Sequence, residues 1–257
     1  MRIACFNING IKARHAALCN WLDEAAPDVV LLQEIKSVEE AFPREPFEDR
    51  GYNVETHGQK GFNGVAILSK TPLEDVRCGL PGDEGDAQAR WIEATVTGAA
   101  GALRVCGLYL PNGNPAPGPK YDYKLAWMER MHIRVVELLA TEEPVLMGGD
   151  YNVIPQDEDA ARPEAWREDA LALSESRAAF RRLMHLGLTE AFRARTQGPG
   201  HYTFWDYQAG AWDRIRIDHL LLSPQAADRM TECGIDSHVR GREKPSDHVP
   251  VWVDLDI

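Results

Sequence analysis

The stretch 145–152, with the sequence VLMGGDYN, is an apolar run that ends in a carboxylate, Asp150, and an amide, Asn152. Alternation along an extended chain would place both side chains on one side, where Asp150 can accept a proton and Asn152 can donate a hydrogen bond to a substrate oxygen. The two preceding glycines would leave room for a phosphate or a metal at the strand end. The alternative is an ordinary Asx turn, which this stretch taken alone favours.

Four other segments place similar groups at the end or the start of an apolar run. These groups are Asn7 and Asn9 after the run from residue 2, Glu34 after the run from residue 29, Asp218 within the run 214–222, and Asp247 with His248 before the run 249–253. In a mixed sheet whose strands run in opposite directions, such ends and starts reach one edge. A structural role explains each segment alone, and His248 is equally well explained as a structural histidine. Their joint occurrence favours a site.

The types of these residues favour hydrolysis of a phosphoester. Oxygen ligands such as Glu34 and Asp247 suit a hard cation, with Mg²⁺ first and Mn²⁺ as a substitute. The sequence contains no Walker loop, no dinucleotide fingerprint, no nucleophilic Ser or Cys motif and no zinc-ligand spacing. A cation beside a carboxylate base and a histidine suits the attack of activated water on phosphorus.

The net charge of −12 excludes a protein that coats nucleic acid by bulk electrostatics, because phosphate contacts require many local Lys and Arg residues. It does not exclude a nucleic-acid enzyme, since a carboxylate cluster can hold a divalent cation that meets the phosphate. With 257 residues and 44% hydrophobic content, the chain can bury a large core, and we expect one domain over 1–257.

No run approaches the roughly 20 apolar residues that a membrane span needs, so we expect no membrane partner. The N-terminal residues start a strand pattern without a signal-peptide leader, which predicts a cytoplasmic location. The five cysteines are dispersed through apolar segments without a CxxC pair, and we expect them to be reduced core residues.

Hydrophobic periodicity predicts the elements that must position the polar groups. Helices are expected at 12–25, 121–140 and 174–186, with a short helix after Ser223, and strands at 2–8, 28–34, 51–57, 64–68, 91–96, 103–110, from 145, at 214–222 and at 249–253. The strands 91–96 and 103–110 should pair as a hairpin. The long polar loop 155–173 is expected to be functional or disordered.

Seven short motifs in this order resemble the exonuclease III family of the endonuclease/exonuclease/phosphatase superfamily, and the resemblance spans nearly the whole chain. They are NING at 7–10, LQE at 32–34, GVAILS at 64–69, GDYN at 149–152, YTFWDY at 202–207, RID at 216–218 and SDH at 246–248. The resemblance implies an α/β fold of the α+β kind, a four-layered sandwich with two packed mixed β-sheets flanked by helices.

The resemblance also implies a magnesium-dependent enzyme that incises DNA at abasic sites and removes nucleotides or blocking groups from 3′ ends. It implies that Glu34 is the main metal ligand, with Asn7 and Asn9 beside it and Asp247 at the metal side. Asp150 would deprotonate the attacking water, and Asn152 would hold the phosphate or that water. His248, polarised by Asp218, would bind a phosphate oxygen, and Tyr109 would lie against the scissile phosphate. Whether Asp150 or the His248–Asp218 pair takes the proton stays open.

The implied substrate is double-stranded DNA, especially abasic or 3′-blocked, bound by a monomer. Phe204 and Trp205 match the aromatic wall that receives a flipped, base-less sugar, with Trp212 beside them and Asn112 as a further substrate contact. Core packing is the alternative for these aromatic residues. The segment 212–216 is a few residues shorter than the family pattern, which leaves the pocket shape and the balance of endonuclease to exonuclease activity open.

Two other functions compete with this prediction. An inositol-phosphate or lipid phosphoesterase of the same superfamily would share the SDH motif, and the sequence AWDRI at 211–215 is similar to a motif of the inositol polyphosphatases. This segment lacks the proline that precedes the polyphosphatase motif. The acidic residue is instead Asp218, at the position that it has in the nucleases. A catalytically silent nucleic-acid-binding regulator is the second alternative, although every predicted catalytic position is filled.

Overall fold

The computed structural model describes residues 1–206 and 213–257. Its strands form two six-stranded mixed sheets and one hairpin within these residues. The first sheet has the order β13 (Met230–Ile235), β14 (Val251–Leu255), β1 (Arg2–Asn7), β2 (Val29–Gln33), β4 (Val65–Ser69), β3 (Asn53–His57). The second has the order β5 (Glu74–Cys78), β6 (Trp91–Thr97), β7 (Ala102–Tyr109), β8 (Val145–Asp150), β12 (Asp218–Leu222), β9 (Thr189–Glu190). The hairpin joins β10 (Phe204–Asp206) and β11 (Asp213–Ile215).

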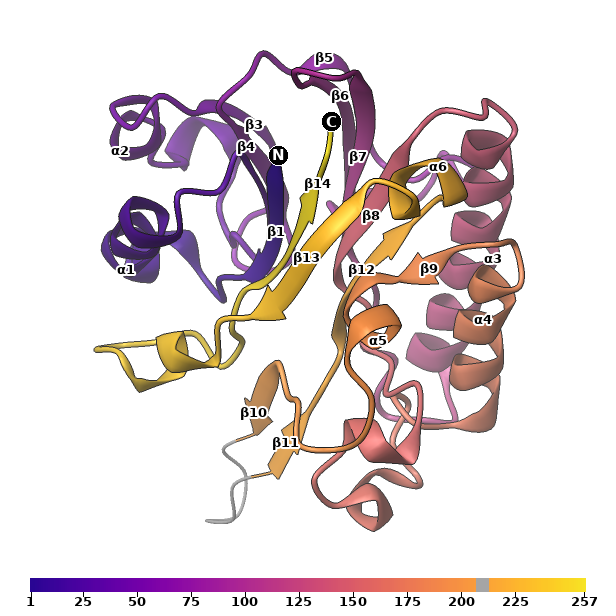
Figure 1. The fold of residues 1–257 in the computed structure, drawn as a ribbon. Coiled ribbons are helices and arrows are strands. Elements are labelled where there is room, and N and C mark those ends of the chain that lie inside the picture. Colours follow the sequence, from indigo (N-terminus) through magenta and orange to yellow (C-terminus); the bar gives the residue numbers. More distant parts are fainter. Residues whose placement is uncertain (207–212) are drawn as a thin grey trace.

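Helices cover the outer faces of both sheets (Figure 1). The first sheet carries α1 (Ile11–Ala25) and α2 (Glu45–Glu48), and the second carries α3 (Pro119–Leu139) and α4 (Ser174–Met184). The remaining helical segments are short: α5 (Ala191–Arg195), α6 (Pro224–Ala227) and 3-10 turns at Glu39–Ala41, Asp157–Asp159, Pro163–Trp166 and Ser237–Gly241. Within the described residues, no helix combines the length and the hydrophobicity that crossing a membrane requires.

Strand alternation sorts the apolar residues into layers. Cys5 of β1 and Leu31 of β2 point into the core between the sheets, together with Leu146 and Leu220 of the second sheet. In the first sheet, the chain neighbour Phe6 instead packs beneath α1, and in the second sheet Leu221 packs beneath α3 and α4. The order helix, sheet, sheet, helix confirms the expected four-layered sandwich.

Gly148 and Gly149 serve packing between strands, so the expectation that they make room for a phosphate or a metal was wrong. A Cβ on Gly148 would lie 2.6 Å from Leu220 Cδ2 and 2.9 Å from Leu31 Cδ1, where the two sheets meet. A Cβ on Gly149 would lie 1.9 Å from the backbone oxygen of Leu108 on the neighbouring strand. Both glycines therefore let β8 approach its neighbours closely.

The predicted α1, α3, α4 and the β6–β7 hairpin are confirmed, with ends shifted by a few residues. The strand predicted at 214–222 is wrong as one element, because β11 ends at Ile215 and β12 begins at Asp218 in a different sheet. The strands β5 and β13 were not predicted from the sequence; they lie at sheet edges and expose much of their surface. Edge strands lack the apolar pattern of central strands.

The five cysteines are free, and three of them are buried: Cys5, Cys19 and Cys106. Cys78 is exposed on β5 and Cys233 is half-buried on β13. The expectation that all five are core residues was wrong for these two, because both lie on the edge strands that the sequence did not reveal.

Candidate active site

The predicted polar segments meet at one end of the sandwich, around a cavity of about 370 Å³. Glu34 follows β2 and His248 precedes β14 in the first sheet, whereas Asp150 ends β8 and Asp218 begins β12 in the second. The prediction that one mixed sheet presents them was wrong. Their convergence is real, because the two sheets pack face to face and share this end.

The Asn7 side chain joins the two sheets at the centre of the site. Its Nδ2 donates to Glu34 Oε1 and to Asp150 Oδ2, each at 3.0 Å, and the residue is fully buried. Its Oδ1 accepts from the backbone N–H of Asn9 at 3.1 Å. One amide thereby fixes the relative positions of two carboxylates from different sheets.

Asp150 takes part in the turn and in the site at the same time. Its Oδ1 accepts from the backbone N–H of Asn152 at 2.8 Å, which is the Asx turn considered above, while its Oδ2 faces Asn7 and lies 3.8 Å from His248 Nε2. The strand ends at Asp150, and Asn152 adopts a left-handed φ of 46°. Both residues line the cavity because the chain turns, not because a strand alternates as predicted.

His248 and Asp218 form a buried pair. The Nδ1 of His248 lies 2.8 Å from Asp218 Oδ2, and the backbone N–H of Asp218 donates to Thr203 Oγ1 at 3.1 Å. In the antiparallel β8–β12 ladder, Asp218 lies directly opposite Asp150. The pair therefore holds the imidazole with its Nε2 directed towards Asp150 and the cavity.

The protonation equilibria of the carboxylates and the histidine differ in direction. Burial, reinforced by nearby Asp218 and Glu34, raises the pKa of Asp150 to about 7 against the opposing effect of His248. Burial opposes the charged form of His248, but Asp218, Asp150 and Asp247 outweigh it and raise the pKa of the imidazole to about 10. Burial also acts to raise the pKa of Glu34, yet hydrogen bonds from Asn7 and Lys36 hold it below its usual value.

The oxygen-rich part of the site fits a hard divalent cation. Glu34 Oε2 and Asn9 Oδ1 both face the Nζ of Lys36, at 2.9 Å and 2.5 Å, so these oxygens already surround a positive charge. Asn9 Nδ2 in turn donates to Asp247 Oδ1 at 3.0 Å. Potential ligand atoms of Glu34, Asp150 and His248 also lie within 4.8 Å of one another. Carboxylate and amide oxygens are the donors that Mg²⁺ prefers.

Tyr109 and Asn112 line the same cavity, as predicted for substrate contacts. Burial and the nearby Glu34 and Asp150 raise the pKa of the Tyr109 phenol, so the hydroxyl keeps its proton and can donate it in a hydrogen bond. The guanidinium of Arg90 stacks 4.8 Å from the Tyr109 ring, a contact that the sequence did not reveal. Asn112 Nδ2 donates to Asn152 Oδ1 at 3.2 Å.

The two predicted wall aromatics lie on opposite faces of β10. Phe204 lines the cavity, with its ring 4.8 Å from that of His248. Trp205 lines a separate cavity with Tyr202, and Arg240 stacks over its ring at 6.0 Å. The structure therefore does not bring Trp205 into the candidate site, because neighbouring strand residues alternate. Trp212 lies outside the described residues.

Two loops contribute cavity residues that the sequence did not reveal. Asn114 Nδ2 donates to both carboxylate oxygens of Asp169, at 3.0 and 3.1 Å, and both residues line the cavity. Trp166 also lines it and donates from Nε1 to Asp213 Oδ2 at 2.8 Å. The length of the loop 155–173 was the available signal, but no sequence pattern indicates which of its residues turn inwards.

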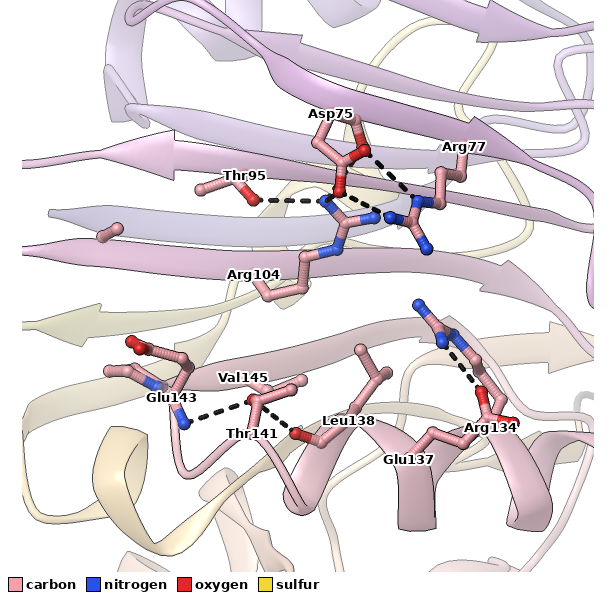
Figure 2. A pocket seen from close by; sticks show the side chains of 12 residues that line it. Asp75, Arg77, Thr95, Arg104, Arg134, Glu137, Leu138, Thr141, Glu143 and Val145 are labelled. Atoms are coloured by element: carbon pink, nitrogen blue, oxygen red, sulfur yellow. Dashed lines mark hydrogen bonds and ion pairs between the residues drawn. The ribbon is translucent and has the colours of Figure 1, made fainter.

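A second charged cavity, of about 410 Å³, lies at the opposite ends of β7 and β8 (Figure 2). Its three arginines are paired with carboxylates. Asp75 contacts Arg77 and Arg104, and the buried Glu93 contacts Arg104 and Arg134. Because its positive and negative charges are matched, this cavity is a structural ion-pair network and presents no comparable chemistry.

Comparisons with known proteins agree with this geometry. The sequence model described as the Endonuclease/Exonuclease/phosphatase family matches residues 4–248. The chain is 37% identical to the Exodeoxyribonuclease III of Haemophilus influenzae, across 99% of this chain and 100% of that protein. The structure of a 3′ phosphatase from Neisseria, solved with a product DNA hairpin, matches with a TM-score of 0.94 and 34% sequence identity. The structure of an AP endonuclease from Archaeoglobus fulgidus matches with a TM-score of 0.92 and 33% sequence identity. Each match covers 100% of both chains.

Proposed function

The chain belongs to the Endonuclease/Exonuclease/phosphatase family, and from this membership and the site we infer that it is a DNA repair nuclease that hydrolyses phosphodiester bonds. The observation that carries the inference is Asn7, which holds Glu34 and Asp150 together beside the His248–Asp218 pair. The DNA hairpin bound to the Neisseria phosphatase and the name of the Haemophilus relative support DNA as the substrate.

We assign the base to Asp150. A general base acts best when its pKa lies near the working pH, and burial brings the pKa of Asp150 to about 7. His248 is protonated at neutral pH, because Asp218 and the other carboxylates raise its pKa to about 10. The imidazolium is therefore suited to donate a hydrogen bond to a phosphate oxygen, and Asp150 is suited to accept the proton of the attacking water.

The neutral side chains orient the phosphate and the water. Asn152 and Asn112 are hydrogen-bonded to each other, so their amides are fixed relative to Asp150. The protonated hydroxyl of Tyr109, which also lines the cavity, can donate to a phosphate oxygen. These groups place the reacting atoms, and such placement supplies much of the rate enhancement in phosphoryl transfer.

Mg²⁺ is the proposed cofactor, with Mn²⁺ as a substitute. Glu34, Asn9 and Asp247 would hold it. Asn7 would order Glu34 and Asn9 through its hydrogen bonds, and Asn9 would in turn order Asp247. When bound, the cation would neutralise phosphate charge that builds up during the reaction. Their oxygen donors and the positive charge they already surround support this assignment.

The proposed substrates are double-stranded DNA with an abasic site, cut on its 5′ side, and duplexes with a 3′ end or a 3′ blocking group. The names of the Neisseria and Archaeoglobus relatives, a 3′ phosphatase and an AP endonuclease, support both kinds of reaction. Phe204 gives the cavity an apolar wall of the kind that a base-less sugar requires. We further propose that the chain acts as a single-domain monomer in the cytoplasm.

The test uses purified protein, one internally abasic duplex and one blunt duplex, each with Mg²⁺ or with a chelator. We expect incision of the first, shortening of the second, and loss of both with the chelator. Phosphate release from an inositol phosphate, with neither duplex cleaved, would instead establish the superfamily phosphoesterase. Binding without any cleavage would establish the silent regulator.

Glu34→Gln tests the metal assignment. The substitution keeps the shape of the side chain but removes the negative charge that faces Lys36 and the proposed cation. We expect the Mg²⁺ concentration for half-maximal cleavage to rise by about 10-fold or more, as for other changes around metal ligands. Isothermal titration with Mn²⁺ measures the same loss without activity. An unchanged titration would exclude Glu34 as a ligand.

A further inference from the structure

Lys124 on α3 is a buried cation that the proposed reaction does not use. The residue is fully buried, and its Nζ donates to three backbone carbonyls: Asn152 at 2.7 Å, Ala170 at 3.0 Å and Asn112 at 3.1 Å. An ammonium group has three donors, so each finds one acceptor. Among residues 1–206 and 213–257, no carboxylate forms an ion pair with the Lys124 ammonium.

Each carbonyl belongs to a different loop, and each loop lines the candidate active site. Asn112 lies after β7, Asn152 lies in the turn after β8, and Ala170 lies before α4, next to Asp169. The side chains of Asn112, Asn152 and Asp169 all line the active-site cavity. Lys124 therefore stands behind the wall that carries the proposed phosphate-orienting amides and binds its three segments at one point.

The loop after β7 is shaped around this lysine. Gly113 has a left-handed φ of 91°, and a Cβ there would lie 2.7 Å from Lys124 Cδ. The same loops also contact one another, since the backbone N–H of Ala170 donates to Asn114 Oδ1 at 3.1 Å. The junction thus joins its loops directly as well as through the ammonium.

Burial of this ammonium is energetically unfavourable in itself. Desolvation lowers the pKa of Lys124 to about 7, although Asp169 and Asp150 act in the opposite direction. A methionine of similar length would fill the same space without removing a charge from water. Packing alone therefore does not explain a lysine at this position, whereas three carbonyls that converge on one point do.

We propose that Lys124 is a positioning residue for phosphodiester hydrolysis, whose ammonium holds the loops after β7 and β8 and before α4 so that Asn112 and Asn152 meet the phosphate. This proposal rests on the proposed nuclease function. Without the ammonium, the three carbonyls lose their common donor, and the loops that carry the two amides are held only by their remaining hydrogen bonds. A shift of about 1 Å in such groups lowers the rate by about 100-fold.

The test compares Lys124→Met with Arg130→Met on the same helix. Arg130 is also largely buried, but it binds Asp86 and the Leu80 carbonyl, which do not line the active-site cavity. For Lys124→Met we expect kcat on the abasic duplex to fall by about 100-fold, with KM changed by less than about threefold. Arg130→Met should lower only the melting temperature.

Hydrogen exchange gives a readout that does not depend on activity. In Lys124→Met, the amides of 112–114, 152–154 and 170–171 should exchange faster than in the parent, while Arg130→Met should leave them unchanged. Lys124→Gln retains some donors and should lose less activity than Lys124→Met. It also tests the proposal if Lys124→Met does not fold, because parental kcat and parental exchange in Lys124→Gln would then overturn it.

The possible failures are distinguishable. If the parent cleaves DNA and Lys124→Met cleaves it equally well, the positioning role is wrong while the proposed function stands. If the parent cleaves no DNA, the proposed function is wrong. In that case, hydrogen-exchange rates in the three loops that are the same in Lys124→Met as in the parent would also show that Lys124 does not hold these loops. A loss of kcat in Arg130→Met equal to that in Lys124→Met would likewise overturn the proposal.

Discussion

The opposite ends of β7 and β8 carry two cavities with different charge balance. At the catalytic end, five carboxylates line the cavity, namely Glu34, Asp150, Asp169, Asp206 and Asp247, and His248 is the one basic group among the described residues that line it. At the other end, Arg77, Arg104 and Arg134 meet carboxylates in mutual ion pairs (Figure 2). The same strands thus support an unbalanced cluster at one end and a balanced one at the other.

The difference in charge balance supports the assignment of the first cavity as the active site. Paired charges satisfy each other and need no ligand, so the arginine cavity is complete as it stands. An excess of carboxylates is costly unless another cation joins them, and Lys36 supplies only part of that charge. Cavity volume alone does not separate the two, since the structural cavity is slightly larger, at about 410 Å³ against about 370 Å³.

The largest effect should come from Asp150→Asn at the unbalanced end. Loss of the general base should lower kcat by about 3,000-fold, or about 5 kcal/mol of activation free energy. Stability should not fall, because the substitution removes a buried carboxylate that lies opposite Asp218. Single-turnover incision of an abasic duplex and urea denaturation measure the two quantities. Cleavage at the parental rate would remove Asp150 as the base.

The reverse pattern is expected at the balanced end for Arg134→Met. Glu93 is 2% exposed and loses its contact at 2.6 Å, so we expect the free energy of unfolding to fall by about 3 kcal/mol while kcat and KM stay at parental values. Adding Glu93→Gln should restore part of that stability, which a double-mutant cycle measures. A fall in kcat without a fall in stability would contradict the assignment of this cavity as structural.

A third paired cluster extends the comparison to pH. Glu190 Oε1 lies 3.1 Å from Arg216 Nη1. Although burial opposes it, the charge of Arg216, together with hydrogen bonds from His219 and from the backbone N–H of Arg193, lowers the pKa of Glu190 from 4.5 to about 2. Because the pKa of Glu190 is lower in the folded protein than in the unfolded chain, its ionised carboxylate stabilises the fold at pH values above 4.5. This stabilisation is lost as the pH falls from 4.5 towards 2.

Glu190→Gln should therefore lower the free energy of unfolding by about 3 kcal/mol at pH 7, and the difference from the parent should shrink as pH falls towards 2. Urea denaturation at a series of pH values gives both curves. A difference that stays constant over this range would show that the Glu190 charge contributes nothing to stability.

The sequence predicts the convergence of the polar side chains better than it predicts how the strands are divided between the sheets. Glu34, Asp150, Asp218 and His248 could be found because each ends or starts a strongly apolar run, and such runs become the buried central strands. The division of these strands between two sheets could not be found, since apolar runs carry no mark of their partner strand. The edge strands β5 and β13 were missed because their exposed residues lack that apolar pattern.

Two residues around the site could not be predicted from the sequence: Asn114, on the loop after β7, and Lys124, on α3 behind the cavity wall. Both make contacts with segments tens of residues away, and no local pattern encodes such contacts. The direction of Trp205 was missed for a simpler reason. The sequence placed Phe204 and Trp205 in one wall without applying the strand alternation that separates them, which β10 imposes.

The smallest expected effect tests that separation. Phe204→Leu removes the ring that packs 4.8 Å from His248, and we expect kcat/KM on the abasic duplex to fall by about 10-fold, or about 1.4 kcal/mol. Trp205→Leu alters the cavity on the other face of β10 and should change kcat/KM by less than about twofold, within the range of substitutions away from a site. Equal losses would mean that both faces of the strand contact the DNA. A loss in Trp205→Leu alone would mean that the cavity shared with Tyr202, and not the one beside His248, receives the abasic sugar.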